Sequence, residues 1–244
     1  MEFSNKRKKY LFFARLAEQC GEHNVVLENM DKIIENKVEL TIEERNLLLS
    51  SFKRIFAKKN YSLRPLFKER FWLKEKEKDR RKLELIENFI KKIEDELIIL
   101  ATQFIQKIDD HILPYSTNSE DKVFYFKLKA DYFRNLNEIS SNKEFINNAV
   151  SNYEKGLEIA QKELNPTNLI LLGLILNYSV FCHDILMDEK GYILIKKSFE
   201  TTLPLLETLS PNENKEISLL LQLYRDNIKL WESEKHDVDN DEGN

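Results

Sequence analysis

Glycine and proline are scarce in this sequence, which has only five of each among its 244 residues. Both residue types mark turns and strand ends, so their scarcity argues against many short strands and favours long helices. No unbroken run of 18 apolar residues occurs, so no membrane span is expected. The amino-terminal stretch starts with basic residues, but Arg15 and Glu18 interrupt its apolar part, which argues against a signal peptide.

Cysteine and histidine are also few. Cys20 and Cys182 lie far apart in the sequence, as expected of a chain in the reduced cytoplasm. The four histidines are His23, His111, His183 and His236. They form no HExxH pattern, no CxxC pair occurs, and glycine-rich nucleotide-binding motifs are missing. We therefore expect no metal site and no cofactor.

Helical periodicity extends over most of the chain and predicts an all-α fold. About nine antiparallel helices are expected, at residues 4–20, 24–36, 42–75, 79–110, 119–139, 142–164, 168–186, 189–208 and 212–233. Capping-box spacing begins the helices at Thr41, Ser141 and Ser210. Pro65 and Pro204 fall inside predicted helices, where a proline removes a backbone donor and predicts a kink or break.

One domain is predicted for residues 1–233. The remaining residues, 234–244, read EKHDVDNDEGN and are polar and acidic, so a disordered tail is expected. No sequence repeat of fixed period is found, which gives little support to a solenoid.

Two predicted helices place an amide among apolar residues. At about 100° per residue, one stripe contains Leu220, Leu223, Asn227, Leu230 and Trp231, and another contains Gly173, Leu176, Asn177, Val180 and Asp184. A dry, unpaired carboxamide costs roughly 1–3 kcal/mol, so each amide needs a partner. That partner is either a neighbouring helix, as in an ordinary core, or the backbone of a bound peptide.

Two other helices carry basic stripes. One contains Lys53, Asn60 and Arg64, and the other contains Lys127, Asp131, Arg134 and Glu138. Taken singly, such stripes are usually solvated surface. Taken together with the apolar stripes, they suggest one cup-shaped domain with a concave amphipathic groove, whose cationic wall binds an anion.

The sequence resembles a divergent member of the 14-3-3 family, dimeric all-α proteins that bind phosphoserine and phosphothreonine peptides. The resemblance covers nearly the whole chain and is carried by LAEQ (16–19), EERNLL (43–48), KVFYFKLKADYFR (122–134), NPTNLILLGLILNYSVF (165–181) and LLETLSPNENKEISLLLQLYRDNIKLW (205–231). The last stretch is the most specific of these.

The resemblance implies the residues that contact a peptide. They are Lys53, Arg64, Lys127, Arg134, Leu176, Asn177, Val180, Asp184, Leu223, Asn227, Leu230 and Trp231. Among them, Lys53, Arg64 and Arg134 match phosphate ligands, Lys127 a groove lysine, and Asp184 an acidic groove residue. The amides match those that bond a peptide backbone, and the other five form the apolar wall.

Two positions depart from the family pattern of the phosphate pocket. Asn60 stands where the family has an arginine, and Asn135 stands where it has a tyrosine. Charge-assisted hydrogen bonds contribute roughly 1.5–3 kcal/mol each, so these losses predict phosphate binding weakened by about 10²–10³-fold. Lys58 and Lys59 lie off the stripe and could replace the missing charge only if the helix were distorted.

The resemblance also implies a dimer, with an altered interface. Its predicted residues are Leu16, Cys20, Glu22, Leu66, Phe89, Lys92 and Glu96. The apolar part is kept, but Glu22 replaces an arginine that pairs with Glu96, and Val25 replaces an aspartate that pairs with Lys92. Like charges repel, so facing Glu22 and Glu96 predict a homodimer, or a heterodimer with a paralogue, that is weak or splayed.

The expected function is a cytoplasmic adaptor that clamps or masks phosphorylated partners. The alternative is a module of the same fold that binds unphosphorylated acidic or amphipathic peptides. An enzyme using Asp131 and Glu138 is disfavoured, because neighbouring cations depress carboxyl pKa values, the wrong direction for a general acid. Nucleic acid is not expected as a partner, since the net charge is -4 and acids interrupt the basic stripes.

Overall fold

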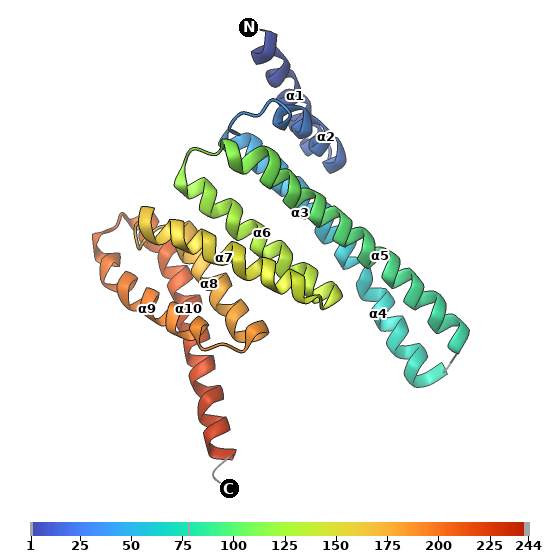
Figure 1. The fold of residues 1–244 in the computed structure, drawn as a ribbon, viewed down its shortest axis with the longest axis vertical. Helices are drawn as coiled ribbons and strands as arrows, with labels where there is room; N and C mark the ends of the chain where they lie inside the picture. The colour runs from blue at the N-terminus through green and yellow to red at the C-terminus, as the bar shows by residue number, and fades with distance from the viewer. Residues whose placement is uncertain (1, 78, 242–244) are drawn as a thin grey trace. The chain divides into compact units, whose positions relative to one another are not determined.

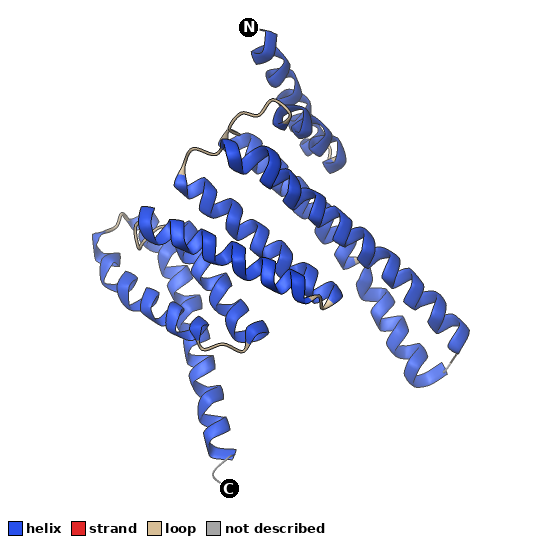
Figure 2. Cartoon of the chain, in the orientation of Figure 1, coloured by secondary structure: helices blue, strands red, loops and turns tan. Residues whose placement is uncertain are grey.

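The computed structural model describes residues 2–77 and 79–241, and within these ranges the chain forms helices and loops without a strand (Figure 2). The predicted all-α class is confirmed. The chain divides into two compact units where the sequence predicted one domain. Unit 1 comprises Met1–Thr117 and Glu138–Ser141, and unit 2 comprises Asn118–Asn137 and Asn142–Asn244. Each unit is described by itself.

Unit 1 contains the first five α-helices (Figure 1). They are α1 (Glu2–Gln19), α2 (His23–Ile34), α3 (Ile42–Tyr61), α4 (Leu63–Trp72) and α5 (Arg80–Lys107). Shorter π- and 3₁₀-helical segments are η1 (Leu73–Glu77), η2 (Ile108–Ile112) and η3 (Leu113–Tyr115). In the core, the ring of Phe52 on α3 stacks on that of Phe104 on α5, with centroids 3.7 Å apart.

The start of α3 is fixed by a buried carboxylate. Thr41 and Glu44 form the predicted capping box, in which the Glu44 N–H donates to the Thr41 hydroxyl and the Thr41 N–H donates to the Glu44 carboxylate at 2.8 Å. Arg7 of α1 donates its Nε to the same carboxylate at 2.7 Å. This contact ties α1 to α3, and Glu44 is only 1% exposed.

The proline at residue 65 breaks the predicted third helix. The expected segment 42–75 is divided at Ser62 into α3 and α4. Pro65 lies in the first turn of α4, where backbone N–H groups form no hydrogen bond within the helix, so the N–H that proline lacks is not needed. Lys53 and Asn60 therefore lie on one helix and Arg64 on the next.

Unit 2 is built from α6 (Ser119–Ser140) except its last three residues, and from α7 (Lys143–Glu163), α8 (Leu169–Phe181), α9 (Lys190–Thr202) and α10 (Pro211–Asp241). Two short segments extend these helices, η4 (Cys182–Leu186) and η5 (Leu203–Thr208). Helix α9 ends two residues before Pro204, which lies in η5, so the second predicted break is also confirmed.

Helix α8 is the core helix of unit 2. Residues Leu169–Leu186 are long and apolar enough to cross a membrane by length and composition, and 44% of this window is buried in the structure. Leu172, Leu174 and Phe181 are fully buried in the unit 2 core. The Tyr224 hydroxyl of α10 donates to the Leu172 carbonyl at 2.7 Å. We interpret the apolar stretch as a helix packed within the protein.

The end of α10 differs from the sequence expectation. The helix continues to Asp241, so residues 234–241 are helical rather than disordered, while residues 242–244 lie outside the described part. Glu234 contacts His183, and Lys235 pairs with Glu189 at 2.5 Å. These contacts attach the first turn beyond residue 233 to the rest of unit 2, which composition alone does not reveal.

Candidate functional site

Asp131 is the hub of the polar residues on α6, α7 and α8. Its Oδ1 accepts a hydrogen bond from the Tyr153 hydroxyl at 2.6 Å and another from Asn177 Nδ2 at 2.9 Å. Its Oδ2 lies 2.6 Å from Lys127 Nζ, one helical turn away. The amide partner that the sequence left open is therefore partly supplied by the protein, because the donor end of Asn177 is held by Asp131.

Tyr153 is the buried member of this network. Burial raises the pKa of its hydroxyl far above the ordinary value, and the Asp131 carboxylate raises it further, whereas Arg134 acts in the opposite direction. The hydroxyl thus remains protonated and donates to Asp131. Arg134, Lys127 and Asn177 are all half-buried and belong to unit 2, so this unit brings together three of the predicted contact residues.

The apolar stripe of α10 is exposed in its middle and buried at its end. Leu223 is 48% exposed and Leu230 is 52% exposed. Asn227 donates its Nδ2 to the Leu223 carbonyl at 2.9 Å, so the donor end of this amide is satisfied within its own helix. The sequence placed Trp231 in the same apolar wall, but in the structure this residue is 2% exposed and belongs to the unit 2 core.

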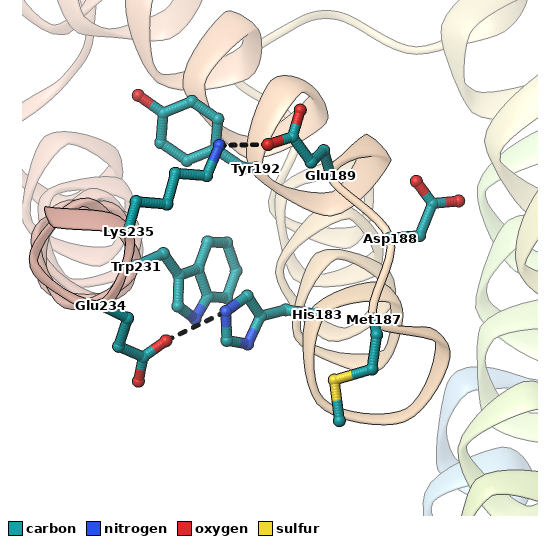
Figure 3. A pocket seen from close by; sticks show the side chains of 8 residues that line it. All are labelled: His183, Met187, Asp188, Glu189, Tyr192, Trp231, Glu234 and Lys235. Carbon is teal, nitrogen blue, oxygen red and sulfur yellow. Dashed lines mark hydrogen bonds and ion pairs between the residues drawn. The ribbon is translucent and has the colours of Figure 1, made fainter. Parts of the chain in front are cut away.

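The corresponding stripe of α8 is less exposed. Leu176 and Val180 are half-buried and pack against the core of unit 2. Asp184, in η4, is exposed and lies 2.9 Å from Nδ1 of His183. His183 also lines a cavity with Trp231 (Figure 3). Sequence reasoning assigned no role to His183 beyond excluding it as a metal ligand.

The cationic residues of unit 1 lie on exposed helix surface. Lys53 and Asn60 are exposed on α3. Arg64 is exposed on α4, and its guanidinium carbon lies 4.8 Å from the centre of the Tyr61 ring. Such stacking leaves the guanidinium edge open to hydrogen bonding, so Arg64 is able to receive an anion.

Lys58 and Lys59 are next to Asn60 in the sequence, but neither occupies the position of the missing arginine. Lys59 forms an ion pair with Glu96 of α5, so its charge is already balanced within unit 1. Lys58 is exposed. Neither side chain lies on the stripe of Lys53 and Asn60, because each is about 100–200° away around α3.

Comparison with known proteins identifies the family. The model of the 14-3-3 protein family matches residues 13–232. The sequence is 37% identical to protein BMH2 of Saccharomyces cerevisiae over 235 residues, covering 95% of this chain and 86% of the relative. It is 36% identical to human 14-3-3 protein beta/alpha over 235 residues, covering 94% of each chain. The chain belongs to the 14-3-3 family.

Asp131 and Tyr153 were not among the site residues predicted from the sequence, although they hold the Asn177 side chain in the structure of this 14-3-3 protein. In the sequence, Asp131 is a carboxylate four residues after Lys127, a spacing that predicts an ion pair on one helix face, and it was otherwise considered only for the disfavoured enzyme. The bonds that it accepts from α7 and α8 come from residues 22 and 46 positions further along the chain. No local pattern predicts such distant contacts.

The residues predicted at the 14-3-3 dimer interface lie on unit 1 and are largely open. Leu16 is 41% exposed and Phe89 is 52% exposed, while Cys20 is exposed and Leu66 half-buried. Glu22, Val25 and Lys92 are exposed too, and Glu96 is half-buried beside Lys59. Phe12 and Phe13, which sequence reasoning did not consider, are 55% and 45% exposed on α1.

Proposed function

We propose that this protein is a phosphopeptide-binding adaptor that clamps or masks partner proteins through phosphoserine or phosphothreonine. Proteins of the 14-3-3 family are adaptors rather than enzymes, and they bind phosphorylated client peptides. The observation that supports this function most directly is the Asp131 network, which holds Asn177 and Lys127 in a fixed arrangement on unit 2.

Three cations are proposed to bind the phosphate. Lys53 and Arg64 are exposed on unit 1, and Arg134 lies beside Tyr153 on unit 2. Lys127 and Asp184 are proposed to contact other parts of the peptide. Leu176, Val180, Leu223 and Leu230 would form its apolar wall. Arginine and lysine bind phosphate through charge-assisted hydrogen bonds, so retention of these three residues favours a phosphate-dependent interaction.

The phosphate contacts are proposed to be fewer than is usual in the family. Asn60 is exposed and carries no charge, and Asn135 is half-buried and lacks a phenol. Lys59 is committed to Glu96 and does not restore the lost charge. We therefore expect affinity for phosphopeptides that is lower by about 10²–10³-fold than a full set of contacts would give.

Substitution of single cations tests the proposal. In fluorescence anisotropy with a phosphoserine peptide, Lys53→Gln, Arg64→Gln and Arg134→Gln should each weaken binding by about tenfold or more. Lys58→Gln is the matched control, since it removes one exposed charge from α3 outside the stripe, and it should change binding by less than about twofold. Equal losses for all four variants would indicate only a general effect of charge and would contradict the proposal.

The second candidate function is binding of unphosphorylated peptides by the same fold. The neutral residues Asn60 and Asn135 favour it, because they remove two phosphate contacts while the amides and the exposed leucines remain. Under this alternative, Leu223→Ala and Asn177→Ala would weaken binding of an acidic or amphipathic peptide. Under the same alternative, the variants Lys53→Gln, Arg64→Gln and Arg134→Gln would change the affinity for the phosphorylated and the unphosphorylated form of that peptide by the same factor.

A dimer formed through unit 1 is part of the proposal, because proteins of this family form dimers. Leu16, Phe89 and the exposed Phe12 and Phe13 would supply apolar contact. Glu22 cannot replace the arginine of the usual ion pair. We expect association that is weak and that strengthens as salt screens the repulsion between Glu22 and Glu96.

A further inference from the structure

The side chain of Trp231 is buried, although the preceding residue on α10, Leu230, is exposed to solvent. Leu230 is 52% exposed, whereas the side chain of Trp231 is 2% exposed and belongs to the core cluster of unit 2. The imidazole of His183 stacks on the indole, with ring centroids 4.5 Å apart and planes inclined by 15° (Figure 3). His183 is itself 32% exposed, so it stands between Trp231 and the solvent.

Both ring nitrogens of His183 face carboxylates. Nε2 lies 3.1 Å from Glu234 on α10, and Nδ1 lies 2.9 Å from Asp184 beside it in η4. A neutral imidazole carries one N–H and donates to only one of these groups, whereas an imidazolium donates to both. Protonation therefore strengthens the attachment of the ring over Trp231. The carboxylates are 50% and 49% exposed, so each contact is weak enough to be reversible.

The other charged groups around the imidazole do not oppose its protonation. A cavity of about 490 Å³ adjoins His183 and Trp231, and its remaining lining residues are Met187, Asp188, Glu189, Tyr192, Glu234 and Lys235. Lys235 pairs with Glu189 at 2.5 Å and lies over the Tyr192 ring, so these two charges cancel locally. The Asp188 carboxylate accepts from the Lys190 N–H at 2.8 Å and adds negative charge.

We propose that His183 is a pH-sensitive cover on Trp231. When protonated, it donates to Glu234 and Asp184 and shields the indole. When neutral, it moves into the adjoining cavity and exposes the indole. The uncovered indole would add an apolar contact for a bound peptide. That last step rests on the proposed function, whereas the cover itself does not.

Quenching of Trp231 fluorescence by acrylamide tests the cover without any peptide. Trp72 is the second tryptophan and is 47% exposed, so the Trp72→Phe variant isolates the Trp231 signal. Between about pH 5.5 and about pH 8, the quenching constant should rise by roughly two- to fivefold, as expected for loss of one or two exposed ion pairs. A quenching constant that stays flat over this range would overturn the proposal.

Three variants in the same background separate the cover from general effects of pH. His183→Gln should give strong quenching at every pH, because the stacked ring is lost. His183→Phe should give weak quenching at every pH, because a phenyl ring is more apolar than a neutral imidazole, does not titrate, and stays stacked on the indole. Glu189→Gln breaks the neighbouring ion pair with Lys235 and should keep the full pH dependence. Persistence of the pH dependence in His183→Gln would assign it to another group and refute the role of His183.

The consequence for peptides is measured separately. If the proposed function holds, a phosphopeptide with an apolar residue next to the phosphoserine should bind His183→Gln more tightly than His183→Phe. Equal binding would refute the use of the uncovered indole. Failure of the phosphopeptide to bind any variant would instead refute the proposed function, and the quenching results would still decide whether the cover exists.

Discussion

Replacement of Asn60 by arginine is the perturbation with the clearest expected gain. Asn60 is exposed on the last turn of α3, seven residues after Lys53 on the same helix face, so an arginine there would place its guanidinium on the basic stripe. It would add one charge-assisted, bidentate contact to phosphate. At roughly 1.5–3 kcal/mol, this contact corresponds to phosphopeptide binding that is tighter by about 10- to 150-fold.

The matched control is Asn46→Arg. Asn46 is also an exposed asparagine on α3, but it lies 14 residues earlier, about 21 Å along the helix. This distance exceeds the Debye length of about 8 Å at physiological ionic strength, so the added charge should change affinity by less than about twofold. Fluorescence anisotropy would compare both variants with the unmodified protein, using a phosphoserine peptide and its unphosphorylated twin.

Two results would refute the reasoning. Absence of any gain in Asn60→Arg would mean that the break at Ser62 has placed Asn60 and Arg64 on surfaces that no single phosphate reaches. An equal gain for the unphosphorylated peptide would mean that the new arginine binds another part of the ligand.

The remaining predictions concern stability and association. Tyr153→Phe removes a buried donor to Asp131 and should lower the free energy of unfolding by about 1.5–3 kcal/mol in urea titrations, and no change would contradict the hub. Burial raises the pKa of Glu44, but hydrogen bonds from Arg7 and Thr41 outweigh burial and depress the pKa overall. The ionised Glu44 carboxylate should therefore stabilise the fold above about pH 4.5, the ordinary pKa of a glutamate, and this stabilisation should be lost at lower pH. In Glu44→Gln, the free energy of unfolding should no longer fall with pH for this reason. Glu22→Arg should reverse the salt dependence of dimerisation in sedimentation experiments, whereas Glu22→Gln should only abolish it.

Local rules predicted much of the fold. The capping box at Thr41 and Glu44 was confirmed because it involves only neighbouring backbone groups. The breaks near Pro65 and Pro204 were confirmed because a proline lacks the N–H that a helix interior requires, so it is tolerated in the first turn of a new helical segment but not in the middle of a long one. The division into two units could not be predicted, because it depends on the distribution of contacts over the whole chain.

The site was predicted less completely. The helical wheel placed Trp231 on the same stripe as Leu230, but a wheel gives only direction and cannot show that His183 covers the indole. The continuation of α10 beyond residue 233 depends on contacts of Glu234 and Lys235 with residues about 50 positions earlier in the chain. Such contacts contribute to helix stability without leaving a compositional signal.

Dependence on phosphate is the central claim, and one pair of peptides tests it most directly. A phosphoserine peptide with upstream arginine and downstream proline would be compared with its unphosphorylated twin by fluorescence anisotropy at low and moderate salt. We predict micromolar binding of the phosphorylated form alone, weakening as salt rises, if the proposed phosphate ligands Lys53, Arg64 and Arg134 are sufficient. Equal binding of both peptides, or of neither, would contradict this prediction and show that this chain keeps the 14-3-3 fold without the phosphate switch.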